Sequence, residues 1–366
     1  MNKKKYLPFI LVIVIIIVGI YITYITIQPM PYVFMTKWGS YGSMDGQFKN
    51  ISYITVDFES NVYIADYKNY RIEKFDSSGK FLTKVGSYGS GDGQFKGPFD
   101  IAVDTKGYIY NTVFGPLGNI HINDVKRCCI QKFDSSGKFI TIWKKDDSII
   151  EIETDASGYI YTATYGKDAI FFQKFTSKGN YLGKVNIHIP TTVHPTLPVC
   201  FWDLHDSLDN IVLDSYGYIY ITYHIDLMHS DFHNLDYACI YKFDSSGKFI
   251  TKWEPLANKG INDFYSFIYK LNSGGRFTKR IKRKMPAGSN LLDMAVDSKG
   301  NIFLTYYDDP CVYKYTSSGI FLTKFGSKGS GNGQFNQPSK LAIDSKGNVY
   351  VVDSVNYCIQ KFSPKQ

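Results

Sequence analysis

Hydrophobic and polar positions alternate along most of this chain, in short runs separated by turns rich in Asp, Ser and Gly. Ile101, Val103 and Ile109 show the alternation of half-buried strands, and the Asp-x-x-Gly turn between them favours a tight hairpin. A second turn, Asp-Ser-Ser-Gly, joins further strand-like runs at 76–79, 134–137 and 244–247. The pattern predicts units of four short antiparallel strands.

The four-strand unit recurs along the chain. A Lys-aromatic pair follows each aspartate that introduces a copy, and these aspartates are Asp57, Asp104, Asp155, Asp214, Asp297 and Asp344. A single four-stranded sheet cannot bury both of its faces alone, so neighbouring copies must stack. Radial stacking predicts an all-β fold, a six-bladed β-propeller of four-stranded antiparallel blades.

The two ends of the repeat array complement each other. The last copy stops at Lys361-Phe362 with three strands, whereas FMTKWGSYGSMDGQF at 34–48 matches the outer strand and connector at 81–95 and 321–335. The N-terminal strand is therefore predicted to complete the last blade, so that the propeller covers 32–366 and hides its sheet edges.

These residues resemble the NHL repeat propellers. FDIAVDTKGYIY at 99–110, KLAIDSKGNVYVVDSVNYCIQKF at 340–362 and DYKNYRIEKF at 66–75 carry the resemblance most fully. It implies six blades and, for most relatives, binding rather than catalysis. The sequence departs from the pattern at 59–61, where Glu-Ser-Asn stands in place of a Gly-containing turn, and long loops replace the Asp-x-x-Asn turn in the second and fourth copies.

An insertion separates the fourth and fifth copies. IYKLNSGGRFTKRI at 268–281 is similar to IYKFDSSGKFITKW at 240–253, but no AVDxxGxIY sequence precedes it. Residues 254–264 are too few for another strand pair. We therefore predict an inserted hairpin within 254–290, rather than a seventh blade.

The N-terminal segment predicts a membrane anchor. Residues 6–27 contain no charge and would span about 33 Å as a helix, close to the hydrocarbon core of roughly 30 Å. Lys3, Lys4 and Lys5 precede this run, so residues 1–5 are expected in the cytoplasm and the propeller outside the cell membrane. A cleaved signal peptide shares these features; the length of the run and the lack of a small-residue pair after it favour the anchor.

The net charge of +8 is concentrated in the insertion. A run without acidic residues there either forms a solvated loop or binds an anionic surface, and its candidate residues are Arg276, Lys279, Arg280, Lys282, Arg283 and Lys284. No nucleic acid is expected as a partner, because an outward-facing domain would rarely meet it.

One loop gathers potential metal ligands. The sequence HIDLMHSDFHNLD suits zinc or another divalent cation, and its candidate ligands are His224, Asp226, His229, Asp231 and His233. The spacing fits no standard metal motif, so a polar rim loop is the alternative. The resemblance includes a zinc lyase, but its ligands come from several blades rather than from one loop.

Cysteines occupy equivalent positions. Cys129, Cys239, Cys311 and Cys358 all begin the third strand of a copy, which places them farther apart than the roughly 7 Å that a disulfide allows between Cα atoms. We expect small buried hydrophobic residues there. Cys128 and Cys200 lie outside this set and remain candidates for pairing.

The function predicted from the sequence is that of a membrane-tethered, extracytoplasmic module. It would bind a protein, peptide or glycan through enlarged rim loops at 111–127, 188–207, 224–237 and 254–290, without a cofactor. The alternatives are a metal-dependent lyase or hydrolase that uses the His/Asp loop, and a passive spacer in the envelope.

Overall fold

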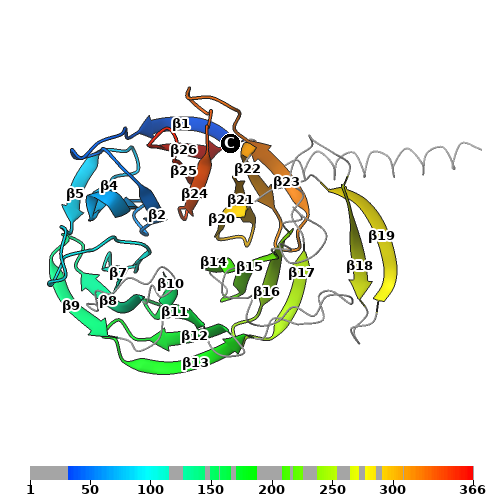
Figure 1. Ribbon diagram of the computed structural model, residues 1–366, viewed down its shortest axis with the longest axis horizontal. Coiled ribbons are helices and arrows are strands. Elements are labelled where there is room, and N and C mark those ends of the chain that lie inside the picture. Colours follow the sequence, from blue (N-terminus) through cyan, green and yellow to red (C-terminus); the bar gives the residue numbers. More distant parts are fainter. Residues whose placement is uncertain are drawn as a thin grey trace, which may run out of the picture.

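The computed structural model describes residues 32–365, apart from 115–126, 145–148, 156, 166–169, 188–207, 215–216, 226–236, 254–263, 272–276, 286–290 and 308. Within these residues, six four-stranded antiparallel sheets surround a central axis as the blades of a propeller (Figure 1). The predicted all-β, six-bladed fold is confirmed.

The strands of each blade are numbered first to fourth from the central channel outward. Blades 1 to 3 contain β2 (Ile51–Val56), β3 (Val62–Asp66), β4 (Arg71–Phe75) and β5 (Phe81–Val85); β6 (Ile101–Val103), β7 (Ile109–Phe114), β8 (Arg127–Phe133) and β9 (Phe139–Lys144); and β10 (Ile149–Thr154), β11 (Ile160–Tyr165), β12 (Ile170–Phe175) and β13 (Tyr181–Ile187).

Blades 4 to 6 follow the same order. They contain β14 (Leu208–Leu213), β15 (Ile219–Ile225), β16 (Tyr237–Phe243) and β17 (Phe249–Trp253); β20 (Leu291–Val296), β21 (Ile302–Tyr306), β22 (Asp309–Tyr315) and β23 (Phe321–Phe325); and β24 (Pro338–Ile343), β25 (Val349–Asp353), β26 (Cys358–Pro364) and β1 (Tyr32–Trp38). A separate two-stranded sheet, β18 (Phe264–Leu271) with β19 (Phe277–Met285), lies in the insertion and joins none of the six blades.

The N-terminal strand closes the ring as predicted. β1 pairs antiparallel with β26 from Tyr32 opposite Pro364 to Trp38 opposite Ile359. The Tyr32 ring stacks on Phe325 of blade 5 at 4.8 Å, and the Trp38 ring lies 6.1 Å from Phe75 of blade 1. β1 therefore contacts three consecutive blades.

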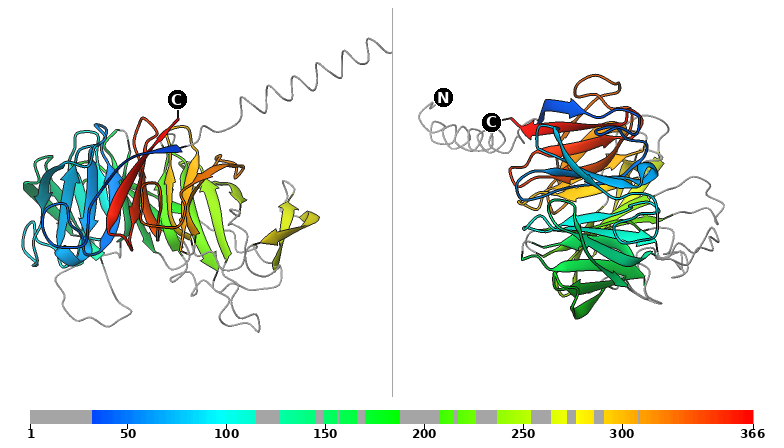
Figure 2. Two further views of the ribbon diagram at one scale, coloured as in Figure 1. Left: turned by 90° about the horizontal axis from the view of Figure 1, so that it is seen from above. Right: turned by 90° about the vertical axis from the view of Figure 1, so that its left-hand side faces the viewer.

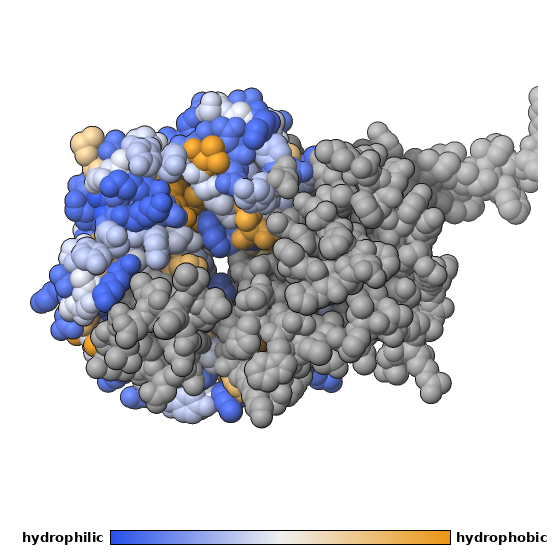
Figure 3. Space-filling model, viewed as in Figure 1, coloured by the Kyte–Doolittle hydropathy of each residue, from blue (hydrophilic) through white to orange (hydrophobic). Residues whose placement is uncertain are grey.

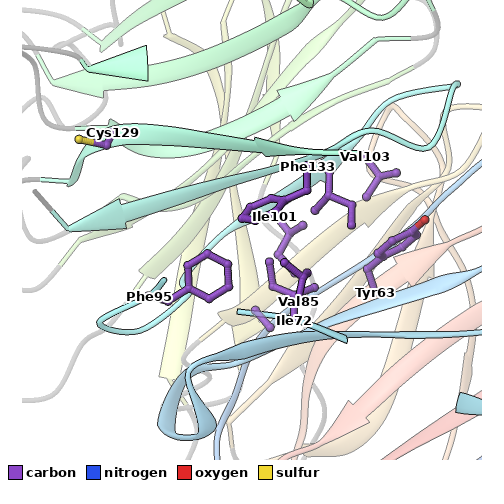
Figure 4. Packing of buried hydrophobic residues seen from close by; sticks show 10 residues of the cluster. Tyr63, Ile72, Val85, Phe95, Ile101, Val103, Cys129 and Phe133 are labelled. Carbon is purple, nitrogen blue, oxygen red and sulfur yellow. The ribbon is translucent and has the colours of Figure 1, made fainter. Parts of the chain in front are cut away.

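The hydrophobic core lies between neighbouring blades rather than within one sheet. Figure 4 shows the cluster between blades 1 and 2, in which Tyr63, Ile72 and Val85 face Ile101 and Phe133. The alternating residues of each strand thus serve two interfaces. This arrangement buries both faces of every blade, which a single sheet could not do.

One turn repeats its hydrogen bonds in blade after blade. Asp104 Oδ1 accepts from the backbone N–H groups of Lys106 and Tyr108, and Asp104 Oδ2 accepts from the Tyr110 hydroxyl at 2.9 Å. Lys132 of the third strand lies over the Tyr110 ring. The equivalent aspartates in blades 1, 3, 4 and 6 also accept from a tyrosine hydroxyl six residues later.

The propeller has two unlike faces. The turns between first and second strands meet those between third and fourth strands: an added Cβ on Gly107 would lie 3.1 Å from Ser135, and one on Gly217 would lie 3.5 Å from Ser245. We call the surface formed by these turns the short-turn face. The opposite surface, formed by the second-to-third and fourth-to-first connections, is the long-loop face, which Figure 1 views from the front.

The structure tests the cysteine predictions for part of the set. Cys129, Cys311 and Cys358 are buried on third strands of three blades, and Cys311 and Cys358 are free thiols, as expected. The side chains of Cys128, Cys200 and Cys239 lie outside the described part of the chain.

The anchor prediction is not tested, because residues 6–27 fall in the N-terminal part that the structure does not describe. Among the described residues, no helix has the length and hydrophobicity needed to cross a membrane.

Candidate functional site

The long-loop face is built from connectors with a repeated shape. In the connector at 39–50, Gly42 N–H donates to Phe48 O and Phe48 N–H donates to Ser40 O, which folds the segment back over a buried phenylalanine. The connectors at 86–100 and 326–337 make the same two bonds around Phe95 and Phe335. Three adjacent fourth-to-first connections therefore present similar backbone surfaces.

An Asp-x-x-Asn turn anchors two of these connectors. In blade 1 the buried Asp66 accepts from the backbone N–H groups of Lys49 and Asn50, and Asn69 Nδ2 bridges Asp66 Oδ2 to the Gly42 carbonyl. Asp353 and Asn356 make the equivalent contacts in blade 6. The turn ends in a residue with left-handed backbone, Tyr70 (φ 58°) or Tyr357 (φ 53°).

These left-handed residues form exposed tyrosine pairs with the connectors. The Tyr41 and Tyr357 rings meet edge to face at 4.9 Å, and the Tyr70 and Tyr88 rings do so at 4.8 Å. Tyr41 is 62% exposed and Tyr88 is 66% exposed. Figure 3 shows that the described part of this face is largely hydrophilic, with isolated hydrophobic patches. The pairs thus place two fixed aromatic groups on a polar surface, a composition typical of recognition sites.

A buried carboxyl supports the connector beside the Tyr41 pair. Glu73 Oε1 accepts from Gly46 N–H, and its Oε2 lies 3.3 Å from Arg71, which donates to the carbonyls of Ser43, Met44 and Gln47. Burial raises the pKa of Glu73 to about 7, although Arg71 opposes this shift. Gln131 and Gln360 hold the equivalent connectors without a charge.

The central channel contains a polar cluster on the first strands. Asp100 Oδ2 accepts from Ile152 N–H of the next blade at 2.7 Å, and Asp293 Oδ2 accepts from Leu341 N–H at 2.7 Å. Lys340 Nζ lies 3.2 Å from Asp293 Oδ1. These bonds tie neighbouring first strands together near the axis.

Carboxyl groups outnumber cations in this cluster. Burial, followed by the charges of Asp100 and Asp293, raises the pKa of the partly buried Glu153 to about 8, so this carboxyl is largely protonated at pH 7. Burial also raises the pKa of Tyr53, and the nearby carboxylates add to this shift. Burial lowers the pKa of Lys340, but the neighbouring Asp293 carboxylate outweighs this effect, so the pKa of Lys340 is raised and its ammonium group stays charged. The channel therefore favours hydrogen-bonding or cationic groups over anions.

The short-turn face opens on the same axis. A pocket of about 210 Å³ is lined there by the turns of four blades, including Asp57, Phe58, Asp104, Asp155 and Ser345. The aspartates face their own turns, where they accept backbone N–H groups. The pocket is thus a shallow mouth whose acidic groups are already engaged.

The predicted metal ligands lie mostly outside the described residues. Asp226, His229, Asp231 and His233 fall in 226–236, and His224 lies in β15 with its side chain not described. Among the described residues, no group of three or more His, Cys, Asp or Glu is arranged to hold a metal ion. This holds for the channel carboxylates too, so the metal site stays a prediction for the undescribed loop.

The predicted anionic-surface residues belong to the inserted hairpin. Lys279, Arg280, Lys282, Arg283 and Lys284 lie on β19, and Arg276 lies just before it. Nothing is described of their side chains. By connectivity, the hairpin interrupts a fourth-to-first connection and therefore belongs to the long-loop side.

Two groups of residues were missed from the sequence alone. The channel positions Tyr53, Asp100, Glu151, Asp293 and Lys340 each stand four residues before a turn aspartate, so aligning the copies at that position would have found them. The tyrosine pairs are harder to find in the sequence, because the two tyrosines of each pair come from segments that are far apart in the repeat.

Comparisons with known proteins agree with the repeat and the fold. The NHL repeat model matches residues 335–362, which form most of blade 6. Protein brain tumor of Drosophila melanogaster is 34% identical over 55 residues, 15% of this chain and 5% of that protein. The chain thus matches only a small part of the length of this relative.

Solved structures resemble nearly the whole propeller. An auxiliary nutrient binding protein from Bacteroides thetaiotaomicron VPI-5482 has a TM-score of 0.52 at 14% identity, with 91% of this chain and 72% of that chain covered. Virginiamycin B lyase from Staphylococcus aureus has a TM-score of 0.51 at 13% identity, with 91% and 99% covered. At such identities the likeness shows the fold alone.

Fold and site together define a six-bladed β-propeller with a rigid ring and unlike connections on one face. The six sequence copies and the matched repeat on blade 6 place it more narrowly: residues 335–362 form an NHL repeat, and the chain is similar to the NHL-repeat β-propellers.

Proposed function

We propose that this chain is a membrane-tethered, outward-facing module that binds a protein, peptide or glycan partner through its long-loop face. The observation that carries the proposal is the pair of exposed tyrosine contacts, Tyr41 with Tyr357 and Tyr70 with Tyr88, held by the Asp-x-x-Asn turns on neighbouring blades. Rings fixed in this way lose little conformational entropy when a partner binds.

Connection length supports the same face. The fourth-to-first connections range from 145–148 to 254–290, and the second-to-third connections range from 307–308 to 115–126. The turns of the short-turn face are nearly uniform. Variation confined to one face of a rigid ring is typical of a recognition surface.

Site-specific photocrosslinking in the native cells tests the proposal. A photoreactive phenylalanine analogue replaces Tyr41 or Tyr88 in the full chain, and the matched control replaces Leu82 or Ile140, which are exposed on the perimeter of blades 1 and 2. We expect a discrete adduct from positions 41 and 88 alone. Equal adducts from the perimeter, or none from the tyrosine positions, would reject the long-loop face as the binding surface.

The metal-dependent alternative has its own test. The metal content of the purified chain is measured beside that of a variant in which His229 and His233 are changed to Ala. If the loop forms a metal site, the parent chain contains stoichiometric metal and the variant loses it. If the chain is a partner-binding module without this site, the parent and the variant have the same metal content.

A further inference from the structure

The described chain enters the propeller at the short-turn face. Tyr32, the first residue of β1, pairs with Pro364, and Pro364 lies against Gly347 in the first turn of blade 6. Figure 2 shows the C-terminus and the start of β1 at the same side of the ring. Only residues 28–31 separate Tyr32 from the apolar run at 6–27, and four residues reach at most about 14 Å.

The short-turn face carries an excess of exposed lysines. Eight stand in its turns and at the C-terminal end: Lys80, Lys106, Lys138, Lys178, Lys248, Lys299, Lys346 and Lys365. The aspartates that begin the turns between first and second strands add no net charge, because each of the six blades also has a lysine on its third strand. Asp297 and Lys314 of blade 5, for example, lie 3.3 Å apart.

Few other carboxylates offset these lysines. Glu59 is an exposed carboxylate in the described turns of this face. Asp76, Asp134 and Asp244 accept hydrogen bonds from backbone N–H groups of their own turns. Eight lysines against these four carboxylates give a balance of +4.

Two exposed apolar side chains lie in the same turns. Phe58 is 73% exposed in the first turn of blade 1, and Ile320 is 63% exposed in the outer turn of blade 5. Lysines interspersed with exposed apolar groups are typical of surfaces that bind at a lipid interface. The described long-loop face instead mixes both signs, with exposed Asp45 and Asp92 as well as exposed Lys68 and Lys328.

We propose that the short-turn face docks on anionic lipid headgroups, so that the long-loop face points away from the bilayer toward its partner. This inference rests on the membrane tether of the proposed function. The short linker would hold the face close to the membrane, within the range where surface charge is only partly screened. The tether supplies proximity, and the lysines set the orientation.

Lysine footprinting of the full chain tests this orientation. The protein is reconstituted into phosphatidylcholine vesicles with or without phosphatidylglycerol, treated briefly with an amine-acetylating reagent, and digested for mass spectrometry. We expect acetylation of Lys106, Lys299 and Lys346 to slow by about fivefold in the anionic vesicles, the effect of one lysine near such a surface, while Lys68 and Lys328 are unchanged. High salt should remove the protection.

A pair of charge-reversal variants provides the matched control. Lys106→Glu/Lys299→Glu/Lys346→Glu should abolish the protection of Lys80 and Lys138, whereas Lys68→Glu/Lys96→Glu/Lys328→Glu, with the same net charge change on the other face, should retain it. All six positions are at least partly exposed, so both variants should melt like the parent. If the melting temperature drops in only one of the two variants, the variants are no longer compared with each other. The test is then the acetylation of the parent protein in low salt against high salt.

Three outcomes would overturn the inference. Equal labelling of both faces, or stronger protection of Lys68 and Lys328, would reject docking by the short-turn face; the latter would point to the basic insertion instead. Protection that persists in neutral vesicles or high salt would assign it to the tether alone. A chain that does not float with vesicles would reject the tether and docking together, and a crosslink at Tyr88 would still support partner binding.

Discussion

The two faces of the propeller use the same strands but different connections. On the short-turn face, aspartate turns repeat one hydrogen-bond pattern around the ring, and their glycines adopt φ angles of 77–81° in five blades. On the long-loop face, connections of unequal length join the same strands. The difference shows that the repeated turns determine the fold, whereas the unlike connections are left to carry function.

The chemistry of the two faces differs in the same way. Asp76, Asp134 and Asp244 have lowered pKa values, mainly because a serine hydroxyl and backbone N–H groups of the same turn donate to them. Their hydrogen-bonding capacity is used locally. On the long-loop face, Tyr41 and Tyr88 leave more than half of their surface to solvent.

Removing one short turn's carboxylate should give the largest effect. Asp104→Ala deletes the acceptor of two backbone N–H groups and of the buried Tyr110 hydroxyl, and it leaves the partly buried Lys132 without its nearby anion. We expect a loss of about 4 kcal/mol in the free energy of unfolding, measured by urea denaturation.

The matched change on the other face is Asp92→Ala, an exposed carboxylate in the connector at 86–100. It should change stability by less than about 0.5 kcal/mol. Similar losses from both variants would show that the two faces contribute equally to the fold, contrary to the comparison.

Much of the fold was predictable because each copy carries its own local signals. The turn aspartates, the Lys-aromatic pairs and the complementary ends required only alignment of the chain with itself. The insertion was recognised as a hairpin from its similarity to 240–253, and β18 and β19 do pair with each other.

The site was less predictable for a physical reason. Tyr41 meets Tyr357 and Lys340 meets Asp293 only after the ring brings distant blades together. Exposure also depends on tertiary placement: Tyr41 and the buried Tyr63 are both aromatic residues in repeated segments. The predicted His/Asp cluster could be read locally because its members are adjacent in sequence, but the structure does not describe that loop.

A pH titration should distinguish the connector of blade 1 from its equivalents. Because the folded pKa of Glu73 is raised to about 7, the folded state keeps a proton that the unfolded chain releases near its ordinary pKa. The contribution of Glu73 to stability, roughly 3 kcal/mol, should therefore be fully present below about pH 4.5, be lost as the pH rises to about 7, and then level off.

Replacing the charged pair isolates this contribution. Arg71→Cys/Glu73→Gln installs the residues found at the same positions in blades 2 and 6, Cys129 with Gln131 and Cys358 with Gln360. Parent and variant are compared by denaturant unfolding from pH 4.5 to 8. If the variant keeps the same slope over this range, the proton is bound elsewhere.

Removing a side chain of β1, the strand that closes the ring, should change stability less than the Glu73 contribution does. Trp38 packs against Phe75 and Tyr350, and an added Cβ on Gly79 would lie 2.5 Å from its ring. Trp38→Ala should lower stability by about 2 kcal/mol, less than for a fully buried tryptophan, because the side chain is partly exposed. Thermal unfolding of this variant is compared with Met35→Ala on the same strand, where a side chain 54% exposed should matter little. Equal melting temperatures for the two variants would mean that the inward side of β1 does not hold blades 6 and 1 together.

The smallest predicted effect is a gain of stability on the short-turn face. Ser60 takes the position that glycine fills in the other copies, with a left-handed φ of 68°, and its buried hydroxyl has no hydrogen-bond partner. Ser60→Gly relieves the backbone strain and removes the unsatisfied hydroxyl, at the cost of greater flexibility in the unfolded chain. A net gain of about 1 kcal/mol is expected in urea unfolding. The reciprocal Gly107→Ser should lose at least as much, because its Cβ would lie 3.1 Å from Ser135. If Ser60→Gly is neutral or destabilising, the turn of blade 1 is not under the strain that its backbone angle implies, and the short-turn face tolerates more local variation than its repetition indicates.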